Sequence, residues 1–165
     1  MKGRIGYAYT ETPIGALEIC YDDEGLYHLL FADELERKDT AAQDPECVTK
    51  ATKQLKEYFE GSRKEFDLPL YIQGTDFQKS VWEELKKIPY ADTVSYLQLA
   101  KSMGDPNSVR AVASANSKNL FMIVIPCHRV VGANGNLVGY AGGIPRKNWL
   151  LEHEQKCSGK TLSLF

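Results

Sequence analysis

The chain has 165 residues, of which 43% are hydrophobic and 25% charged, and its formal net charge is −2. This composition fits a globular protein of one domain or two small ones, and an even spread of the charge would argue against a nucleic-acid partner. No run of about 18 apolar residues occurs and the N-terminal segment lacks a signal-peptide core. We therefore expect a protein without a membrane span that is cytoplasmic, or nuclear if the cell has a nucleus.

Three short segments near the start of the chain predict an antiparallel sheet. They mix β-branched with aromatic residues, and the turn-forming sequences Thr12-Pro13 and Asp22-Asp23-Glu24-Gly25 separate them. This pattern is typical of strands joined by tight turns. The expected strands are residues 4–10, 14–21 and 26–31.

A helix and a short extended segment are expected next. Apolar residues recur at helical spacing from Val48 to Tyr58, and Gly61 is placed to end the helix. Residues 66–71 are apolar but contain Pro69, which cannot donate to a sheet. This segment therefore predicts an edge strand or a linker.

The second half opens with a helix and a helix pair. Thr75 and Gln78 fit a capping box, and Pro89 is placed to stop the helix that follows. The apolar stripe of that helix is Phe77, Val81, Trp82 and Leu85.

Two short helices then have the layout of a helix-turn-helix. Ser95 and Gln98 fit another capping box, which opens a helix that ends near Gly104. Asp105-Pro106 predicts an N-cap followed by proline at the first position of the second helix. From this pattern alone, a plain pair of core helices stays an open alternative.

An apolar run over residues 121–125 leads into Pro126-Cys127-His128-Arg129, where the proline indicates a turn. Asn134-Gly135 lies between apolar flanks and predicts a β-hairpin within residues 130–138. The last helix is expected to start near Pro145. This helix is expected to bury Trp149, Leu150 and His153 and to carry Glu154. From Ser158 onward the chain is expected to be loose.

The charge is unevenly distributed along the sequence. No acidic residue lies between Asp105 and Glu152, although the chain as a whole is acidic. A basic segment of this kind indicates a local site for a polyanion, but a similar number of charges occurs on many ordinary surfaces. The basic residues of the segment are Arg110, Lys118, Arg129, Arg146 and Lys147.

Cys127 is the candidate nucleophile. The four cysteines, Cys20, Cys47, Cys127 and Cys157, show no metal-binding spacing, so we expect free thiols, most of them simply buried. A thiol with a pKa near ~8.5 needs a base, and the base needs an orienting partner. His128 adjoins Cys127, and the turn at Pro126 could bring the two together directly or through one water. Glu154 is the candidate partner of His128.

At these residues the chain resembles the O6-alkylguanine-DNA alkyltransferases. Residues 125–130, with the sequence Ile-Pro-Cys-His-Arg-Val, match the active-site signature of that family. The resemblance is strong from about residue 75 to 155 and looser before, where Thr12-Pro13-Ile14-Gly15 is the main match. The further matching blocks are residues 90–96, 110–112, 139–143 and 147–154, together with Asn119.

The resemblance implies an α/β (α+β) fold in two domains. Residues 1–72 would form a small domain with an antiparallel, ribonuclease H-like sheet. Residues 73–157 would form a mostly helical domain whose helix-turn-helix works from the minor groove, with a tail over 158–165. The implied partner is double-stranded DNA containing alkylated guanine. A monomer is the default expectation for the oligomeric state.

The implied activity is direct-reversal DNA repair. An alkyl group moves irreversibly and stoichiometrically from O6-alkylguanine to Cys127, with O4-alkylthymine as a second candidate substrate. The damaged nucleotide is flipped out, because the alkyl carbon is out of reach within the stacked duplex. No cofactor is expected, since the damaged base is itself the alkyl donor.

The resemblance also implies roles for individual residues. Cys127 attacks the alkyl carbon, His128 takes the thiol proton through a water, and Glu154 orients His128. Asn119 acts as a hinge between the helix-turn-helix and the active-site segment, and Arg110 fills the gap left by the flipped base.

Tyr96 turns the phosphate and donates a hydrogen bond to the guanine ring. The carbonyls of Cys127 and Val130 accept from the exocyclic amine, and Tyr140 lines the pocket. The remaining substrate-binding or DNA-binding candidates are Ser95, Ala141 and Lys147. A solvated position in the first turn of the last helix stays an alternative for Lys147.

The chain departs from the family at two places. Ala141 stands where some members carry serine, which matters only if a hydroxyl rather than the backbone N–H contacts guanine O6. Cys20 and His28 do not match the zinc ligands of some members, so we expect no structural metal.

Two other functions are weighed against alkyl transfer. An alkyltransferase-like protein that only flags lesions lacks the nucleophile, and Cys127 argues directly against it. A hydrolytic cysteine enzyme would use Cys127 and His128, but the sequence shows no evident oxyanion arrangement. It would also leave the arginine-bearing helix-turn-helix unexplained.

Overall fold

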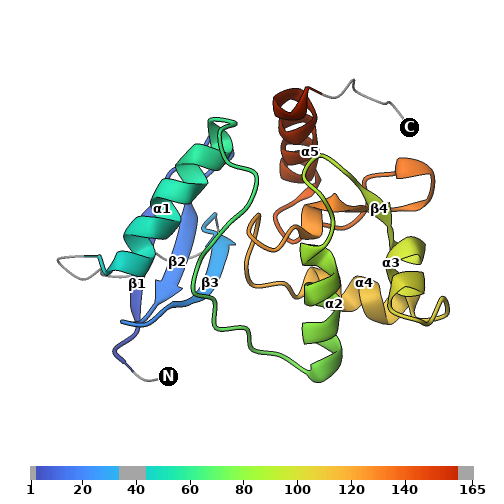
Figure 1. The fold of residues 1–165 in the computed structure, drawn as a ribbon, viewed down its shortest axis with the longest axis horizontal. Coiled ribbons are helices and arrows are strands. Elements are labelled where there is room, and N and C mark those ends of the chain that lie inside the picture. The colour runs from blue at the N-terminus through green and yellow to red at the C-terminus, as the bar shows by residue number, and fades with distance from the viewer. Residues whose placement is uncertain (1–2, 34–43, 160–165) are drawn as a thin grey trace. The chain divides into compact units, whose positions relative to one another are not determined.

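The computed structural model describes residues 3–33 and 44–159 (Figure 1). The chain divides into two compact units, Met1–Ile72 and Gln73–Phe165. No helix within the described residues is both long and apolar enough to cross a membrane.

The first unit is built on a three-stranded antiparallel sheet, as predicted. Its strands β1 (Gly6–Thr10), β2 (Leu17–Tyr21) and β3 (Leu26–Phe31) lie in the order β1-β2-β3. Thr12 and Gly15 exchange backbone hydrogen bonds of 3.1 and 3.2 Å between β1 and β2. Asp22 Oδ1 accepts from the N–H groups of Glu24 and Gly25 in the next turn. Short polar turns therefore fix the register of the sheet.

Helix α1 (Glu46–Phe59) packs along the sheet (Figure 1). Its buried side chains repeat at helical spacing and include Val48, Ala51, Leu55 and Tyr58. Gly61 follows with a φ of 83°, a left-handed conformation that glycine adopts readily, so the predicted end of the helix is confirmed. Residues 66–71 form only one parallel bridge, Leu26 to Leu70, because Pro69 has no N–H to extend a ladder.

The second unit begins with α2 (Asp76–Lys86), whose predicted capping box between Thr75 and Gln78 is present. Val81, Trp82 and Leu85 are buried, and Trp82 Nε1 donates to Ala115 O at 2.9 Å. Phe77, the first residue of the predicted apolar stripe, is 40% exposed, so only the later part of the stripe is buried. The helix packs on its neighbour through its middle turns rather than its first.

Helices α3 (Tyr96–Ser102) and α4 (Val109–Ser117) form the predicted helix-turn-helix arrangement. The capping box of Ser95 and Gln98 is present, and Gly104, with a φ of 91°, follows α3. The predicted start of α4 at Pro106 is wrong. Asp105 Oδ1 instead accepts from Asn107 N–H at 2.9 Å and closes a turn, so the helix begins three residues later.

The predicted hairpin at Asn134-Gly135 forms only its turn. Both residues have positive φ, 59° and 76°, and Gly132 N–H donates to Asn136 O at 2.8 Å. No strand follows this turn in the part of the chain that the structure describes. Strand β5 (Val130–Val131) pairs instead in parallel with β4 (Val94–Ser95), a long-range contact that a local pattern does not predict.

The last helix, α5 (Ile144–Ser158), begins at the predicted proline. Its buried residues are Lys147, Leu150, Leu151 and Glu154. Trp149 and His153 are only half-buried and stack on each other at 4.9 Å, so their predicted burial is wrong. Helix α5 also includes Ser158, and the rest of the expected loose tail, from residue 160, lies outside the described residues.

Candidate functional site

The candidate nucleophile lies on a tight turn. Pro126 adopts φ −80° and ψ 63°, and Cys127 N–H donates to Ile125 O at 2.8 Å, which together form an inverse γ-turn. The chain continues as the one-turn 3-10 helix η1 (Cys127–Arg129), whose three residues are all buried. The predicted turn is confirmed, and the side chain of Cys127 is only 2% exposed.

Asn119 holds the segment that precedes this turn. Its side-chain Nδ2 donates to Ile125 O at 2.8 Å and to Phe121 O at 3.3 Å, and its Oδ1 accepts from Phe121 N–H. Between these contacts Ile123 has a φ of 71°, which is strained for a β-branched residue. One buried amide therefore joins the end of α4 to the backbone of the nucleophile turn.

His128 and Glu154 form a fully buried pair. Nε2 of His128 lies 2.7 Å from Glu154 Oε2, so this nitrogen carries the ring proton in neutral histidine. The other ring nitrogen, Nδ1, has no hydrogen-bond partner among the described residues. The pair thus leaves a lone pair on the imidazole one residue away from Cys127.

Arg129 completes a cluster that the sequence did not reveal. Its Nε donates to Glu154 Oε1 at 2.8 Å and its Nη2 to Glu154 Oε2 at 3.1 Å. Its Nη1 donates to Ile88 O at 2.8 Å, while Ala91 N–H donates to Glu154 Oε1. In the sequence this arginine was only one of several basic residues, and nothing there indicated that its side chain points inward.

The electrostatics of the cluster follow from burial and pairing. Burial raises the pKa of the Cys127 thiol to about 11, although the Asn119 hydrogen bond and the charge of Lys147 lower it. Burial also lowers the pKa of His128 more than Glu154 raises it. Burial acts to raise the pKa of Glu154, but His128 and Arg129 outweigh it and hold that pKa well below its usual range. At neutral pH the group consists of a thiol, a neutral imidazole and an anion paired with Arg129.

Lys147 is buried rather than solvated, so its alternative as a solvated surface residue is wrong. Its Nζ donates to Val138 O at 3.0 Å and to Gly139 O at 3.1 Å, and it lies 5.9 Å from the centre of the Tyr96 ring. Burial lowers its pKa to about 8, against the effect of Cys127. Its contacts anchor residues 138 and 139 rather than reaching toward the protein surface.

A pocket of about 360 Å³ reaches the nucleophile. It brings together five predicted site residues with others from α4 and the segment before α5. The predicted ones are Tyr96, Arg110, Cys127, Tyr140 and Ala141, and the ones that were not predicted include Val109, Ala113, Asn116 and Ser117. Asn116 is buried, and its Oδ1 has no hydrogen-bond partner in the described part of the chain.

The two tyrosines of the pocket remain protonated. Tyr96 Oη donates to Val138 O at 3.3 Å, and burial raises the pKa of Tyr96 against a hydrogen bond from Asn116. Burial also raises the pKa of Tyr140 well above its usual range. Both hydroxyls can therefore act as hydrogen-bond donors toward a ligand.

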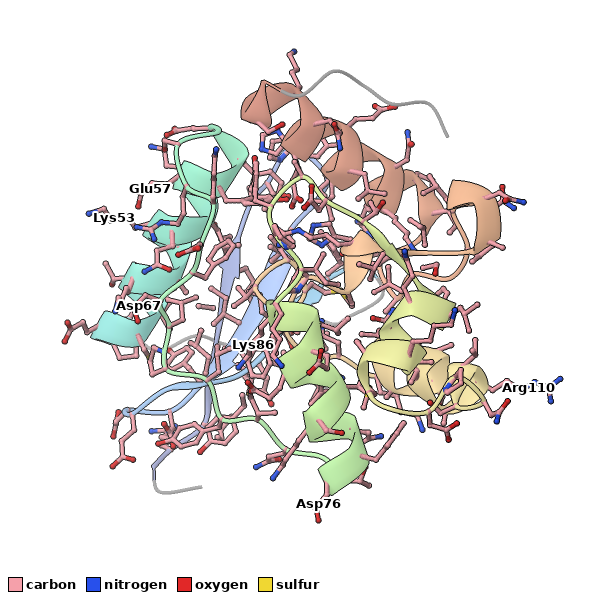
Figure 2. The ribbon with its side chains drawn as sticks, turned by 45° about the vertical axis from the view of Figure 1, so that its right-hand side comes forward. Lys53, Glu57, Asp67, Asp76, Lys86 and Arg110 are labelled. Carbon is pink, nitrogen blue, oxygen red and sulfur yellow. The ribbon has the colours of Figure 1, made fainter. Side chains whose placement is uncertain are left out.

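Ser95 and Val130 lie outside this pocket, whereas Arg110 lies at its edge. Ser95 caps α3, with its Oγ accepting from Gln98 N–H, and lines a neighbouring groove instead. Val130 is buried in β5, where it pairs with Val94. Arg110, at the start of α4, lines the pocket, and Figure 2 shows its side chain extending away from the helix into solvent.

Within residues 3–33 and 44–159 no three side chains of the His, Cys, Asp and Glu types lie close enough to hold a metal ion. Cys20 and His28 are cross-strand neighbours, and His28 Nε2 lies 2.8 Å from Glu18 Oε1. The expected absence of a structural metal stays a prediction.

Comparison with known proteins identifies relatives of both units. Residues 5–72 match the family model for the ribonuclease-like domain of 6-O-methylguanine DNA methyltransferase, and residues 76–156 match that for its DNA binding domain. A methylated-DNA–protein-cysteine methyltransferase of Methanosarcina acetivorans is 45% identical over 154 residues, which cover 92% of this chain and 99% of the relative.

Solved structures give the same result. The crystal structure of Mycobacterium tuberculosis O6-methylguanine methyltransferase is 40% identical, covers 98% of both chains and has a TM-score of 0.83. That of Mycobacterium tuberculosis OGT in complex with DNA is 42% identical, covers 92% of this chain and 93% of its own, and also has a TM-score of 0.83. The predicted fold class is confirmed, and the chain belongs to the 6-O-methylguanine DNA methyltransferase family.

Proposed function

We propose that this protein is a methylated-DNA–protein-cysteine methyltransferase, which repairs DNA by moving the alkyl group of O6-alkylguanine onto Cys127. The observation that carries the proposal is the position of Cys127. It lines a pocket and directly precedes His128, whose Nε2 is held by Glu154 while Nδ1 has no partner among the described residues. The site thus contains a nucleophile, a candidate base next to it in the chain, and a carboxylate that orients the base.

The reaction starts from a protonated thiol, because the pKa of Cys127 is raised. His128 takes the thiol proton at Nδ1 through a water, and the adjacent Glu154 anion stabilises the imidazolium that forms. The sulfur then forms a bond to the alkyl carbon while the bond from that carbon to O6 breaks. The electron pair of the broken bond stays with guanine, which is the leaving group at the alkyl carbon. The guanine ring accepts a hydrogen bond from Tyr96 and becomes a neutral base when it gains a proton.

The product is a thioether, which offers no good leaving group. A second nucleophile that could remove the alkyl group from sulfur is not part of the cluster of Cys127, His128, Arg129 and Glu154. Each molecule would therefore react once. No cofactor enters the reaction, because bond formation and bond cleavage balance between thiol and damaged base.

The proposed partner is double-stranded DNA, bound through the helix-turn-helix of α3 and α4 from the minor-groove side by a monomer. Arg110 projects from α4 at the pocket, where it would fill the space left by a flipped base (Figure 2). The DNA complex of the Mycobacterium tuberculosis relative supports DNA as the partner. Ser95 and Tyr96 would contact the backbone near the flipped nucleotide.

The remaining pocket residues would position the base. The carbonyls of Cys127 and Val130 would accept from the exocyclic amine, and Tyr140 would form a wall. Ala141 would offer its backbone N–H to O6, and Lys147 would act indirectly by fixing residues 138 and 139. O4-alkylthymine presents a similar alkyl carbon, so it is a second candidate substrate.

The proposal is tested by the intact mass of the protein after incubation with a duplex that carries one O6-methylguanine. We expect one added methyl group, located on Cys127 by peptide mapping, with at most one transfer per molecule and none from an undamaged duplex. An unchanged mass in a protein that still binds the lesion would instead support a lesion-flagging protein.

A further inference from the structure

Arg129 belongs to the nucleophile turn, and its side chain points into the protein. Its side chain is only 6% exposed, and three of its nitrogens donate to Glu154 and to the carbonyl of Ile88. The ring of Tyr90 lies 5.5 Å from the centre of its guanidinium group. The proposed reaction assigns no role to this arginine.

The charges around His128 show what the arginine changes. Glu154 and Lys147 act on the imidazole from α5, and Arg129 acts on it from its own turn. Glu154 is fully buried, and a buried carboxylate without a counter-charge is strongly disfavoured. Without Arg129 the pair would tend to take up a proton, and His128 is the nearest group that can accept one.

We propose that Arg129 is a positioning residue that holds Glu154 as an oriented anion and thereby keeps His128 uncharged and able to accept the thiol proton. The inference rests on the proposed function only in assigning that proton transfer to His128. The arginine balances the carboxylate, so the imidazole does not have to. A histidine already protonated at Nδ1 could not act as the base.

The geometry explains why this residue is an arginine. Two of its nitrogens grip both oxygens of Glu154, which fixes the plane of the carboxylate and leaves Oε2 facing His128 Nε2. A third nitrogen reaches Ile88 O on the loop that also supplies Ala91 N–H to Glu154. A lysine would keep the charge but not this forked contact.

The test measures the protonation of His128 by ¹⁵N NMR and the single-turnover rate of methyl transfer, both as functions of pH. In the unmodified protein His128 should stay neutral, with its proton on Nε2, at pH 7. In Arg129→Gln we expect the pKa of His128 to rise by at least about one unit. The acid limb of the plot of rate against pH should move to higher pH with it. Arg63→Gln, which removes an arginine paired with Glu57 in the first unit, should change neither.

A charge-balance rescue separates this role from simple packing. The double variant with Arg129→Gln and Glu154→Gln removes both charges, so the pKa of His128 and the acid limb should return toward their original positions. The absolute rate need not recover. A packing role predicts no such return, and an unchanged His128 pKa in Arg129→Gln would overturn the inference.

Arg129→Lys covers the case in which Arg129→Gln does not fold. It keeps the charge, so the pKa of His128 should stay close to its original value. Adding Glu154→Gln to Arg129→Lys leaves the new ammonium group unpaired, and this double variant should have a lower His128 pKa than Arg129→Lys alone. Equal pKa values in these two proteins would contradict the proposal. If His128 responds as expected but the unmodified protein transfers no methyl group, the proposed function fails and the inference on His128 stands.

Discussion

Both units of the molecule contain a pair of a buried glutamate and a histidine, with a cysteine beside the histidine. In the first unit His28 Nε2 lies 2.8 Å from Glu18 Oε1, and Cys20 is the cross-strand neighbour of His28. In the second unit His128 lies 2.7 Å from Glu154 and follows Cys127 in the chain. The same three residue types thus occur twice, in two different settings.

The settings differ in the partner of the carboxylate and in access to the thiol. Glu18 accepts a hydrogen bond from Tyr9 Oη at 2.7 Å, whereas Glu154 is gripped by Arg129. Cys127 lines a pocket, whereas the pocket described in the first unit, between the turn after β1 and α1, is lined by other residues. A cysteine, a histidine and a glutamate therefore do not make a site until a cavity reaches the sulfur.

The largest expected effect is the loss of the nucleophile. Cys127→Ser should abolish methyl transfer, because a hydroxyl with an unperturbed pKa is a far weaker nucleophile than a thiolate. The matched change Cys20→Ser should leave transfer intact. Intact mass after incubation with methylated duplex measures both, and transfer by Cys127→Ser would remove the distinction between the two cysteines.

Replacing each of the two glutamates by glutamine sharpens the comparison further. Glu154→Gln should slow single-turnover transfer by roughly 10² to 10⁴, the usual contribution of a positioned acid or base. Glu18→Gln should leave the rate within about twofold and affect only the free energy of unfolding. Equal slowing by both substitutions would mean that the effect is one of general stability.

Arg110 tests the part of the second unit that faces DNA. Arg110→Ala should slow repair in duplex DNA by about 10- to 100-fold. This corresponds to a loss of about 1 to 3 kcal/mol in the stabilisation of the flipped-out base. Reaction with the free alkylated base should be almost unchanged, because no gap then has to be filled. Arg63→Ala serves as the control, and equal slowing with both substrates would exclude the gap-filling role.

The smallest expected effect is a pH dependence of stability from Lys147. Its folded pKa of about 8 lies below the 10.5 of the unfolded chain, so unfolding takes up protons between these values and the free energy of unfolding rises with pH there. Cys127 acts oppositely between 9.0 and about 11, because its folded pKa is raised. The rise should thus appear between about pH 8 and 9, by less than about 1 kcal/mol.

Denaturant unfolding at a series of pH values measures this effect. Lys147→Met should remove the rise between about pH 8 and 9. Lys50→Met, which changes an exposed lysine paired with Asp67 in the first unit, should keep it. A rise that persists without Lys147 would show that another group is responsible.

Local patterns predicted those elements that depend on neighbouring residues. The capping boxes at Thr75 and Ser95 are satisfied within three residues, so the sequence contains both partners. Asp105 satisfied its own turn instead of the helix, a competition between two local hydrogen bonds that sequence cannot rank. The strand after Asn134-Gly135 failed because β5 has a better partner in β4, more than thirty residues earlier.

The residues of the site also divide into those that the sequence predicted and those that depend on tertiary structure. Cys127 and His128 were found from their residue types, and Glu154 from its place in the final helix. Arg129 was missed because a basic residue in a basic segment predicts a surface charge, and only the turn at Pro126 directs it inward. Asn116 was missed because its importance comes from burial beside the pocket, which depends on how α4 packs.

The burial of Cys127 also bears on how long the protein lasts before it acts. Oxidation of cysteine follows exposure and thiolate character, and this sulfur is 2% exposed with a pKa raised to about 11. Dissolved peroxide should therefore meet an almost unreactive thiol. A protein that reacts only once has to keep its thiol reduced until the damaged base arrives. The burial that makes the thiol unreactive in the resting state also protects it from oxidation during that time.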